Sequence, residues 1–588
     1  MLVTCLNSFE IFRRLREAPA LGVDTETTGL RPYHGDRAFS AIIADDNDAY
    51  YFDFKPQSWQ PSRDELGELF GMEKVWYFAN AKFDLAFLEH FGWSVNGTIH
   101  DLQTHERLLD STLFGQVFDL DSIAERYKEK KDAAVLEWIL KNGAWTDVVV
   151  DGRKKERRLH FDRVPHDLIV RYGCQDGRIT YRIGKTQEAR LLASEVVDAP
   201  SLRPLVENER ALTRTVYAME RAGVKVDLAF CQAGATHELK RHAYGKEIFQ
   251  RMTGASFVDS AKALAPHFSG VKFLRTATGA PSFCAEALAT YDHPLVSVVT
   301  EIRDAKSKSD YYRGFLYHAD ADGRIHAQFN QHQAVTGRFS SSQPNLQNLT
   351  RPEEGEPEGA FSVRRAIVPE PGNFLAMFDY DQMEYRLMLE YAGSRALIEK
   401  VLGGLDVHAA TAELAGITRQ QAKTTNFLSI YGGGDATLAS KLGLPVGAAK
   451  AVRDSIFAAA PEIRDFIRQC MARAESRGFV FNWFGRRQYF PDPRTAYRAP
   501  NHIIQGGCAD VVKIAMNRCA ARLRGMATRL VLCVHDELVF EGPPSEAWVL
   551  PELKEIMESV YPFQWLKLTA GASYSFKNLG EKIKGYPA

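Results

Sequence analysis

The chain of 588 residues has almost no net charge and lacks the marks of several specialised protein classes. Its 73 Lys and Arg nearly balance 74 Asp and Glu, which excludes a generally polycationic nucleic-acid-binding protein. The eight cysteines form no C-x-x-C pair, which favours a reducing compartment and argues against a structural zinc site. No apolar run approaches the ~20 residues that span a bilayer, and we expect no signal peptide. These absences predict a cytoplasmic protein.

The composition is that of an ordinary globular protein, with 45% hydrophobic and 25% charged residues. The length predicts three or four domains, and there is no internal repeat. Residues 1–190 alternate short β-rich runs with helical patterns, which predicts an α/β unit. These runs are Gly22–Asp24, Ala41–Ile43, Tyr50–Phe54 and Val75–Phe78. We place a boundary near 190–205, followed by a larger α+β unit.

Acidic residues gather in the pattern of the first unit. Asp24 and Glu26 are two apart in a predicted strand, so both carboxylates should share one face. Asp84 falls in the first turn of a predicted helix, and Tyr172 and Asp176 are spaced i, i+4 on another. Four carboxylates that converge without basic partners fit two hard divalent ions, which can assist phosphodiester hydrolysis. The alternative for each acid is a solvated surface position.

The second unit carries a further set of acids. An apolar strand ends at Asp379 and is followed by a helical pattern. Residues 529–540 read as a hairpin whose tight turn presents Asp536 and Glu537. Two Asp residues from different strands could therefore share a pair of metal ions.

A predicted helix between these two segments suits a nucleoside triphosphate. Thr418 and Gln421 form a capping box, and Gly432 is a suitable stop. Four residues at successive i+4 steps share one face: Arg419, Lys423, Phe427 and Tyr431. The two cations suit a triphosphate and the aromatic rings suit a base. The alternative is an amphipathic helix with an aromatic core stripe and a solvated basic end.

Taken together, these segments resemble motifs A, B and C of the family A DNA polymerases, the DNA polymerase I type. The motifs are Asp-Tyr-x-Gln-x-Glu, Arg-x-x-x-Lys-x-x-x-Phe-x-x-x-Tyr-Gly and His-Asp-Glu. The acidic set of the first unit resembles the DEDD exonuclease superfamily, in the version with Tyr four residues before the last Asp. The resemblance implies an α/β ribonuclease H-like exonuclease domain followed by an α+β right-hand polymerase domain. The implied ranges are 1–195 for the exonuclease and 205–588 for the polymerase, with the thumb at about 205–335, the palm at about 336–400 and 490–588, and the fingers at about 401–489.

The resemblance also implies a role for each matched residue. The implied catalytic residues are Asp379, Asp536, Glu537, Asp24, Glu26, Asp84, Asp176 and Tyr172. The resemblance implies two magnesium ions per active site, with Mn²⁺ as a substitute. The implied metal ligands are Asp379, Asp536, Asp24, Glu26, Asp84 and Asp176. The residues implied to bind the incoming dNTP are Arg419, Lys423, Phe427, Tyr431, Glu384 and Gln382. The residues implied to contact primer-template DNA are Arg338, Asn345, Gln347, Asn348, Gln505 and His535.

The implied roles of Tyr172 and Glu384 each have a physical explanation. In the exonuclease family the Tyr helps to orient the attacking water. Glu384 would exclude a ribose 2′-hydroxyl, because a carboxylate packed against the sugar leaves no room for another oxygen. The alternative for Glu384 is a packing or salt-bridge role near Arg386.

The expected activity is DNA-templated DNA synthesis with 3′→5′ proofreading. One alternative is a DEDD exonuclease whose C-terminal unit only binds DNA, and another is a single-subunit RNA polymerase. The exonuclease motif begins near residue 22 without a preceding 5′-nuclease domain, which favours a phage replicative enzyme in the host cytoplasm. A replisome or processivity factor is an expected partner, and a membrane is not.

Three features depart from the family pattern or lie outside it. Asp381 stands where family members often have Ser, and we expect it to be a solvent-facing residue. Tyr497 stands where an Arg is usual, with Arg498 one place later. The basic run 153–158 follows a hairpin-like signal at 148–152. It is either a solvated turn or a basic flap that guides single-stranded DNA.

Overall fold

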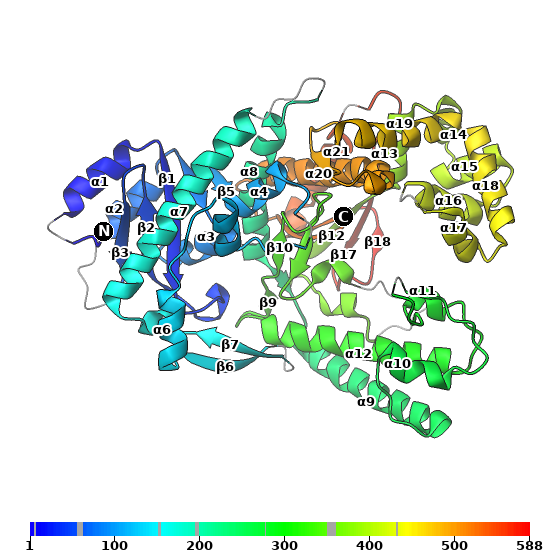
Figure 1. The fold of residues 1–588 in the computed structure, drawn as a ribbon, viewed down its shortest axis with the longest axis horizontal. Coiled ribbons are helices and arrows are strands. Elements are labelled where there is room, and N and C mark those ends of the chain that lie inside the picture. Colours follow the sequence, from blue (N-terminus) through cyan, green and yellow to red (C-terminus); the bar gives the residue numbers. More distant parts are fainter. Residues whose placement is uncertain are drawn as a thin grey trace.

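The computed structural model describes residues 1–4, 7–55, 63–113, 115–150, 154–193, 199–276, 278–349, 360–430, 433–561 and 563–587. In Figure 1 the chain runs from an N-terminal α/β unit in blue, through a long helix pair in green, to a second sheet and a helical group in yellow. Within the described ranges no helix is long and apolar enough to span a membrane.

The N-terminal unit is built on a five-stranded sheet in the order β3-β2-β1-β4-β5. Its strands are β1 (Ala20–Thr27), β2 (Ala38–Ala44), β3 (Ala49–Asp53), β4 (Lys74–Phe78) and β5 (Gly97–Asp101). β1 is central, antiparallel to β2 and parallel to β4. All four strands predicted from β-rich runs are confirmed.

Helices cover both faces of this sheet because both faces are apolar. One core joins the sheet to α1, α2 and α3, and the other joins it to α5, α6 and α7. The helices of the unit are α1 (Ser8–Glu17), α2 (Arg63–Phe70), α3 (Ala81–Glu89), α4 (Leu102–Leu109), α5 (Leu120–Arg126), α6 (Ala134–Asn142) and α7 (His166–Ala193). A separate hairpin of β6 (Trp145–Val150) and β7 (Lys154–Leu159) extends from the unit towards the green helices (Figure 1).

A long helix, α8 (Arg203–Ala222), starts the second unit and is followed by Gly223. It leads to the antiparallel pair α9 (Leu228–Thr253) and α12 (Leu295–His318), which project away from the sheets (Figure 1). Short helices α10 (Ala261–Leu264) and α11 (Ala285–Leu288) lie near the far end of this pair and share a small core with it. The residues between α12 and the second sheet include the short strands β10 (Gln328–Asn330) and β11 (Ser340–Ser342).

The second sheet has the order β15-β16-β12-β17-β18. Its strands are β12 (Phe374–Tyr380), β15 (Arg529–Val534), β16 (Glu537–Gly542), β17 (Ala570–Ser575) and β18 (Ile583–Lys584). Its core extends into α8, α13 (Met383–Ala392), α20 (Ala499–Arg522) and α21 (Leu550–Glu558). The predicted strand-then-helix at β12 and α13, and the predicted hairpin of β15 and β16, are both confirmed.

A group of six helices follows α13 and lies at the upper right in Figure 1, above the α9–α12 pair. Its members are α14 (Arg395–Leu402), α15 (Val407–Ala415), α16 (Arg419–Ile430), α17 (Asp435–Leu442), α18 (Val446–Ala459) and α19 (Pro461–Arg477). A small hydrophobic core and the ion pair of Arg453 with Asp435 hold α17 and α18 together. After α19 come the short strands β13 (Phe479–Phe481) and β14 (Arg487–Tyr489).

A buried ion network fixes α8 to α20 and to the segment before β14. Glu209 Oε1 lies 2.7 Å from Lys513 Nζ and 2.5 Å from Arg486 Nη2, and Arg486 also pairs with Asp510. Burial opposes ionisation of Glu209, but Lys513 and Arg486 lower its pKa to about 2. The same network holds Lys513, whose pKa is lowered by burial and by Arg486 despite the pairing with Glu209.

We predict that Glu209→Gln lowers the free energy of unfolding by roughly 3–5 kcal/mol, because it leaves the buried ammonium of Lys513 without its ion-pair partner. Since the pKa of Glu209 in the fold lies below its ordinary 4.5, the ionised carboxylate stabilises the fold above that pH. This contribution, about 3 kcal/mol, is lost as the pH falls from about 4.5 towards 2. Urea unfolding measured between pH 7 and 3 should therefore show a steeper acid loss for the wild type than for the variant.

The matched control is Glu207→Gln, because Glu207 is on the same helix and its side chain is 58% exposed. It should stay within about 0.5 kcal/mol of the wild type. If both Gln variants lost the same stability, the buried network would not be what holds α8.

Candidate active sites

The predicted acids of the N-terminal unit lie on three elements that pack together. Asp24 and Glu26 are on β1, Asp84 is in the first turn of α3, and Tyr172 and Asp176 are one turn apart on α7. Both helices contact β1. The structure thus gathers all five predicted residues, and they line one large cleft together except for Asp84, which lies just behind it.

Burial and mutual repulsion make this cluster electrostatically unsatisfied. Burial, and then Asp176, raises the pKa of Glu26 to about 8. Burial raises the pKa of Asp84 to about 7, although Thr25 donates a 2.7 Å hydrogen bond to it. Burial and Asp176 also raise the pKa of Asp24 well above its ordinary value. Each carboxylate is therefore costly to ionise unless a cation is near.

The donor set fits a hard divalent ion. Glu26 Oε1 and Asp176 Oδ1 are buried and accept no hydrogen bond from any described residue. Carboxylate oxygens of this kind are the ligands that Mg²⁺ prefers. As the side chains stand, no three His, Cys, Asp or Glu within the described ranges form a ready ligand group.

Lys131 is a member of this cluster that the sequence analysis missed. Its Nζ lies 2.8 Å from Asp176 Oδ2 and 2.5 Å from Asp121 Oδ1, and 5.3 Å from the ring centre of Tyr172. The statement that the four carboxylates converge without a basic partner is therefore wrong. Lys131 sits in a loop after α5, and no spacing relates it to the acidic motifs, so only the tertiary fold reveals it.

The hairpin β6–β7 forms one wall of the same cleft. Arg158 pairs with Asp36 and donates to Thr28 O, while the guanidinium of Arg157 lies 4.2 Å from the ring centre of Trp145. The predicted hairpin is confirmed, but Arg153 lies outside the described residues. The role of this basic run as a guide for single-stranded DNA stays a prediction.

In the second unit Asp379 and Asp536 come together at one end of the sheet. Asp379, near the end of β12, is paired in register with Glu537 on β16. Asp536 occupies the tight turn before β16, and its neighbour His535 adopts φ 57°. Burial, and then the charge of Asp379, raises the pKa of Asp536 to about 6. The two carboxylates thus repel each other across the sheet end, as expected of residues that share a cation.

Glu537 has a different environment from its neighbour Asp536. It is 1% exposed, and its two carboxylate oxygens contact Arg364 Nη1 at 3.3 Å and Lys582 Nζ at 2.7 Å. Cations from the protein therefore already neutralise Glu537, whereas Asp536 faces another acid. A catalytic role for Glu537 stays a prediction.

Beside Asp536 lies a pocket whose walls include Arg338 and Glu384. These two residues form an ion pair, so the partner of Glu384 is Arg338. Arg386, the partner that the sequence suggested, instead donates to the backbone oxygen of Asp381. The role of Glu384 against a ribose hydroxyl and that of Arg338 at DNA stay predictions.

Gln347 supports the turn that carries Asp536. Its Nε2 donates to Cys533 O at 2.8 Å, and its Oε1 accepts from His535 N at 3.2 Å. Gln347 is 7% exposed, so these bonds are shielded from water. The structure therefore gives this predicted DNA-contact residue a bracing role in the free protein.

The helix α16 carries the predicted nucleotide-binding face. The hydrogen bonds of the capping box are present, with Thr418 N donating to Gln421 Oε1 at 3.0 Å and Gln421 N to Thr418 Oγ1 at 3.2 Å. Lys423 is exposed, and Arg419 Nε lies 3.0 Å from Asp406 Oδ2. Tyr431 and Gly432 lie outside the described residues.

The aromatic part of this face packs inward. The ring centre of Phe427 lies 5.6 Å from that of His408 on α15. The helix α16 also contacts α13 and α20, the helices that border the second sheet. The basic start of α16 is thus solvent-accessible.

The remaining predicted contacts lie around the same region. Gln382 adopts φ 51° and its Oε1 accepts from Val407 N at 3.2 Å. Asn345 caps the short turn that contains Asn348, and Gln505 is half-buried on α20. Their roles in binding stay predictions.

The two departures from the family pattern lie on the surface or near it. Asp381 is exposed, as expected. Tyr497 is 40% exposed, and Arg498 Nε donates to its hydroxyl at 3.0 Å.

Two protein families match the chain. The family described as DNA polymerase family A matches residues 232–575, and the family described as 3′-5′ exonuclease matches residues 3–188. DNA polymerase I of Chloroflexus aurantiacus is 32% identical over 94% of this chain and 60% of its own length. DNA polymerase I of Pseudomonas aeruginosa is 31% identical over 90% of this chain and 60% of its own. The chain spans about 60% of the length of these two relatives.

A phage protein and a solved structure match more evenly. DNA polymerase DpoZ of Acinetobacter phage SH-Ab 15497 is 27% identical over 93% of this chain and 95% of its own. The POL domain of Pol1 from M. smegmatis, solved in complex with DNA primer-template and dNTP, is similar with a TM-score of 0.80 and 25% identity, covering 98% of each chain.

Proposed function

Because the chain belongs to the family A DNA polymerases, we propose that it extends a DNA primer along a DNA template and removes nucleotides from the 3′ end at a second site. The observation that carries this proposal is the presence of two acid clusters on two separate sheets. One contains Asp24 and Glu26, and the other contains Asp379 and Asp536. A single acidic site could not serve synthesis and hydrolysis independently.

At the polymerase site the residues of the chain bind and position. Asp379 and Asp536 would hold Mg²⁺, which supplies charge that activates the 3′-hydroxyl and stabilises the leaving pyrophosphate. Arg419 and Lys423 bind the triphosphate, because their cationic ends are accessible at the start of α16. Phe427 then contributes an aromatic face towards the base.

The sugar is selected beside this face. Glu384 lies with Arg338 in the pocket next to Asp536, where a carboxylate held by an ion pair has little freedom to move aside. A ribose 2′-oxygen would meet that carboxylate. We therefore assign Glu384 to exclusion of ribonucleotides.

At the exonuclease site Asp24, Glu26, Asp84 and Asp176 would hold the ions for phosphodiester hydrolysis. Burial and Asp176 raise the pKa of Tyr172, so its phenol stays protonated at neutral pH. It can therefore donate a hydrogen bond and hold the attacking water. The cleft is open to solvent, which supplies that water.

One assay distinguishes the proposal from its alternatives. A labelled primer annealed to a template is offered deoxynucleotides or ribonucleotides in the presence of Mg²⁺. We expect extension with deoxynucleotides and shortening of the primer when nucleotides are withheld. Shortening without extension would indicate an exonuclease with a DNA-binding module, and efficient ribonucleotide extension would indicate an RNA polymerase.

The proposal includes the cofactors, partners and divisions expected from the sequence. Mg²⁺ is the working ion, Mn²⁺ can replace it, and a replisome or processivity factor is a partner. The exonuclease domain comprises 1–195 and the polymerase domain 205–588. A replicative role in the cytoplasm of a phage host is supported by the phage relative that matches along nearly its whole length.

We predict that Lys131→Ala lowers exonuclease activity by about tenfold to a hundredfold, because Lys131 positions Asp176 and Tyr172. Primer extension should be unchanged. The measurement is the rate of digestion of a single-stranded oligonucleotide, together with the Mg²⁺ concentration at half-maximal rate.

The controls separate positioning from folding. Lys131→Arg should restore most of the activity, and Lys130→Ala should have no effect because Lys130 is an exposed neighbour. Equal activity of Lys131→Ala and wild type at every Mg²⁺ concentration would contradict the role.

A further inference from the structure

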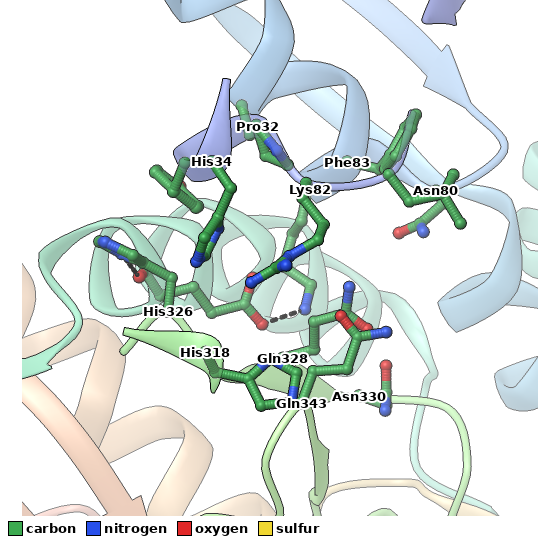
Figure 2. A pocket seen from close by; sticks show the side chains of 15 residues that line it. Pro32, His34, Asn80, Lys82, Phe83, His318, His326, Gln328, Asn330 and Gln343 are labelled. Atoms are coloured by element: carbon green, nitrogen blue, oxygen red, sulfur yellow. Dashed lines mark hydrogen bonds and ion pairs between the residues drawn. The ribbon is translucent and has the colours of Figure 1, made fainter. Parts of the chain in front are cut away.

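A second pocket lies between the proposed exonuclease and polymerase domains, beside the exonuclease cleft (Figure 2). Its cavity volume is about 80 Å³, and it is open to solvent. The segment 30–34 and α3 form its upper wall, and α8, the end of α12 and β10 form its lower wall. Figure 2 shows His34 and Lys82 projecting from the upper wall towards Gln328 and Gln343.

The pocket has an excess of positive charge. Arg31 and Lys82 line it, and among the described residues Glu220 is the only acidic one in its wall. Glu220 is already committed, since it pairs with Lys82 and accepts from Phe329 N at 2.6 Å. The guanidinium of Arg31 therefore has no carboxylate facing it across the pocket, and the space favours an anion.

The positive wall is held in place before any ligand arrives. Arg31 Nη2 donates to Tyr317 O at 2.9 Å, and its guanidinium lies 4.4 Å from the ring centre of Tyr317. The ring of Tyr33 stacks on His326 at 3.8 Å. These contacts fix segment 30–34 on the polymerase domain, so a ligand would lose little free energy in ordering it.

Gln343 joins this pocket to the exonuclease cleft. It lines both spaces, as do Leu30, Arg31, Phe83 and His318. Its backbone has φ 59°, a left-handed conformation that is strained for a residue other than glycine. Because Gln343 lines both spaces, it lies where they meet.

We propose that this pocket binds one nucleotide through its phosphate and its base. Arg31 contacts the phosphate, because a guanidinium fork matches phosphate oxygens. The amides of Gln328 and Gln343 contact the base edge, since an amide offers both a donor and an acceptor. The inference rests on the proposed exonuclease function, because the adjoining cleft supplies the nucleotide either as a released monophosphate or as part of the single strand.

The first arm of the test uses the free mononucleotide. Full-length protein is titrated calorimetrically with dAMP in EDTA, which removes metal-dependent binding at the carboxylates. We expect one site per chain, weakened about tenfold by Arg31→Gln and by Gln343→Gly. The first variant keeps a donor for Tyr317 O, and the second keeps a residue that tolerates positive φ. Arg37→Gln is the matched control, because Arg37 lies outside the pocket.

The second arm uses the strand. Tetranucleotides that carry 5-iododeoxyuridine at one position are bound in EDTA and cross-linked with ultraviolet light. Cross-linking to segment 30–34 at one position, lost in Arg31→Gln, together with no dAMP binding, would support the strand as the source. Saturable dAMP binding with the expected variant effects would support the released monophosphate.

If neither probe responds to Arg31→Gln or Gln343→Gly, the proposal is overturned and the space is only a gap between domains. Thermal unfolding of each variant confirms that it is folded. Digestion of DNA by the wild type in Mg²⁺ is measured separately. A wild type that digests DNA but shows no pocket binding refutes the pocket alone, and one that does not digest DNA refutes the exonuclease proposal.

Discussion

Asp379→Ala and Asp536→Ala are each expected to lower primer extension by about a thousandfold or more while leaving exonuclease activity intact. Loss of the carboxylate removes roughly 4 kcal/mol of transition-state stabilisation, because the cation that it would hold stabilises charge on the reacting oxygens. The two residues are coupled, since Asp379 raises the pKa of Asp536. We therefore expect the double variant to be hardly worse than either single one. Single-turnover extension of a primed template measures the effect.

Asp381→Ala is the matched control for these variants. Asp381 is an exposed acid two residues beyond Asp379 on the same stretch of chain. If any negative charge near Asp379 supported catalysis, removal of Asp381 would lower primer extension as much as removal of Asp379. We expect extension within about twofold of the wild type, because an exposed acid is screened by solvent. A severe loss here would place Asp381 in the site and revise the assignment.

Asp24→Ala should have the opposite effect, with digestion of single-stranded DNA lowered by about a thousandfold and extension preserved. Asp24 lies on β1 in a different sheet from Asp379, so its loss cannot disturb the polymerase carboxylates directly. The measurement is release of mononucleotides from a labelled oligonucleotide, with extension of matched primer as the second readout.

Asp167→Ala is the control at this site, because Asp167 is on α7 with Asp176 but its side chain is 84% exposed. It should digest DNA at the wild-type rate. A single substitution at Asp24 or Asp379 that abolished both activities in a folded protein would refute the two-site model.

Much of the fold follows from local pattern. Short β-rich runs predicted β1 to β4, and an apolar run that ends in a carboxylate predicted β12 before α13. The capping box at Thr418 and Gln421 predicted the start of α16. These features depend on residues close in the chain, so the sequence contains the information directly.

Several partners of the site residues could not be read in this way. The ion pair of Glu384 with Arg338 joins residues 46 apart, whereas the sequence suggested the nearer Arg386. Gln347 braces a hairpin that is 186 residues further along the chain. Long-range pairs of this kind leave no periodic signal, since any of the 73 cations could have met a given acid.

The sequence by itself identified the residues that we propose for the chemistry, through the spacing of Asp24 and Glu26 on a strand and through an acid at the end of an apolar strand. The tertiary structure decided how those charges are balanced, with Lys131 beside Asp176 and with Arg364 and Lys582 on Glu537. The physical reason is that a motif is local, whereas the neutralisation of a buried charge depends on whichever chain segments pack around it.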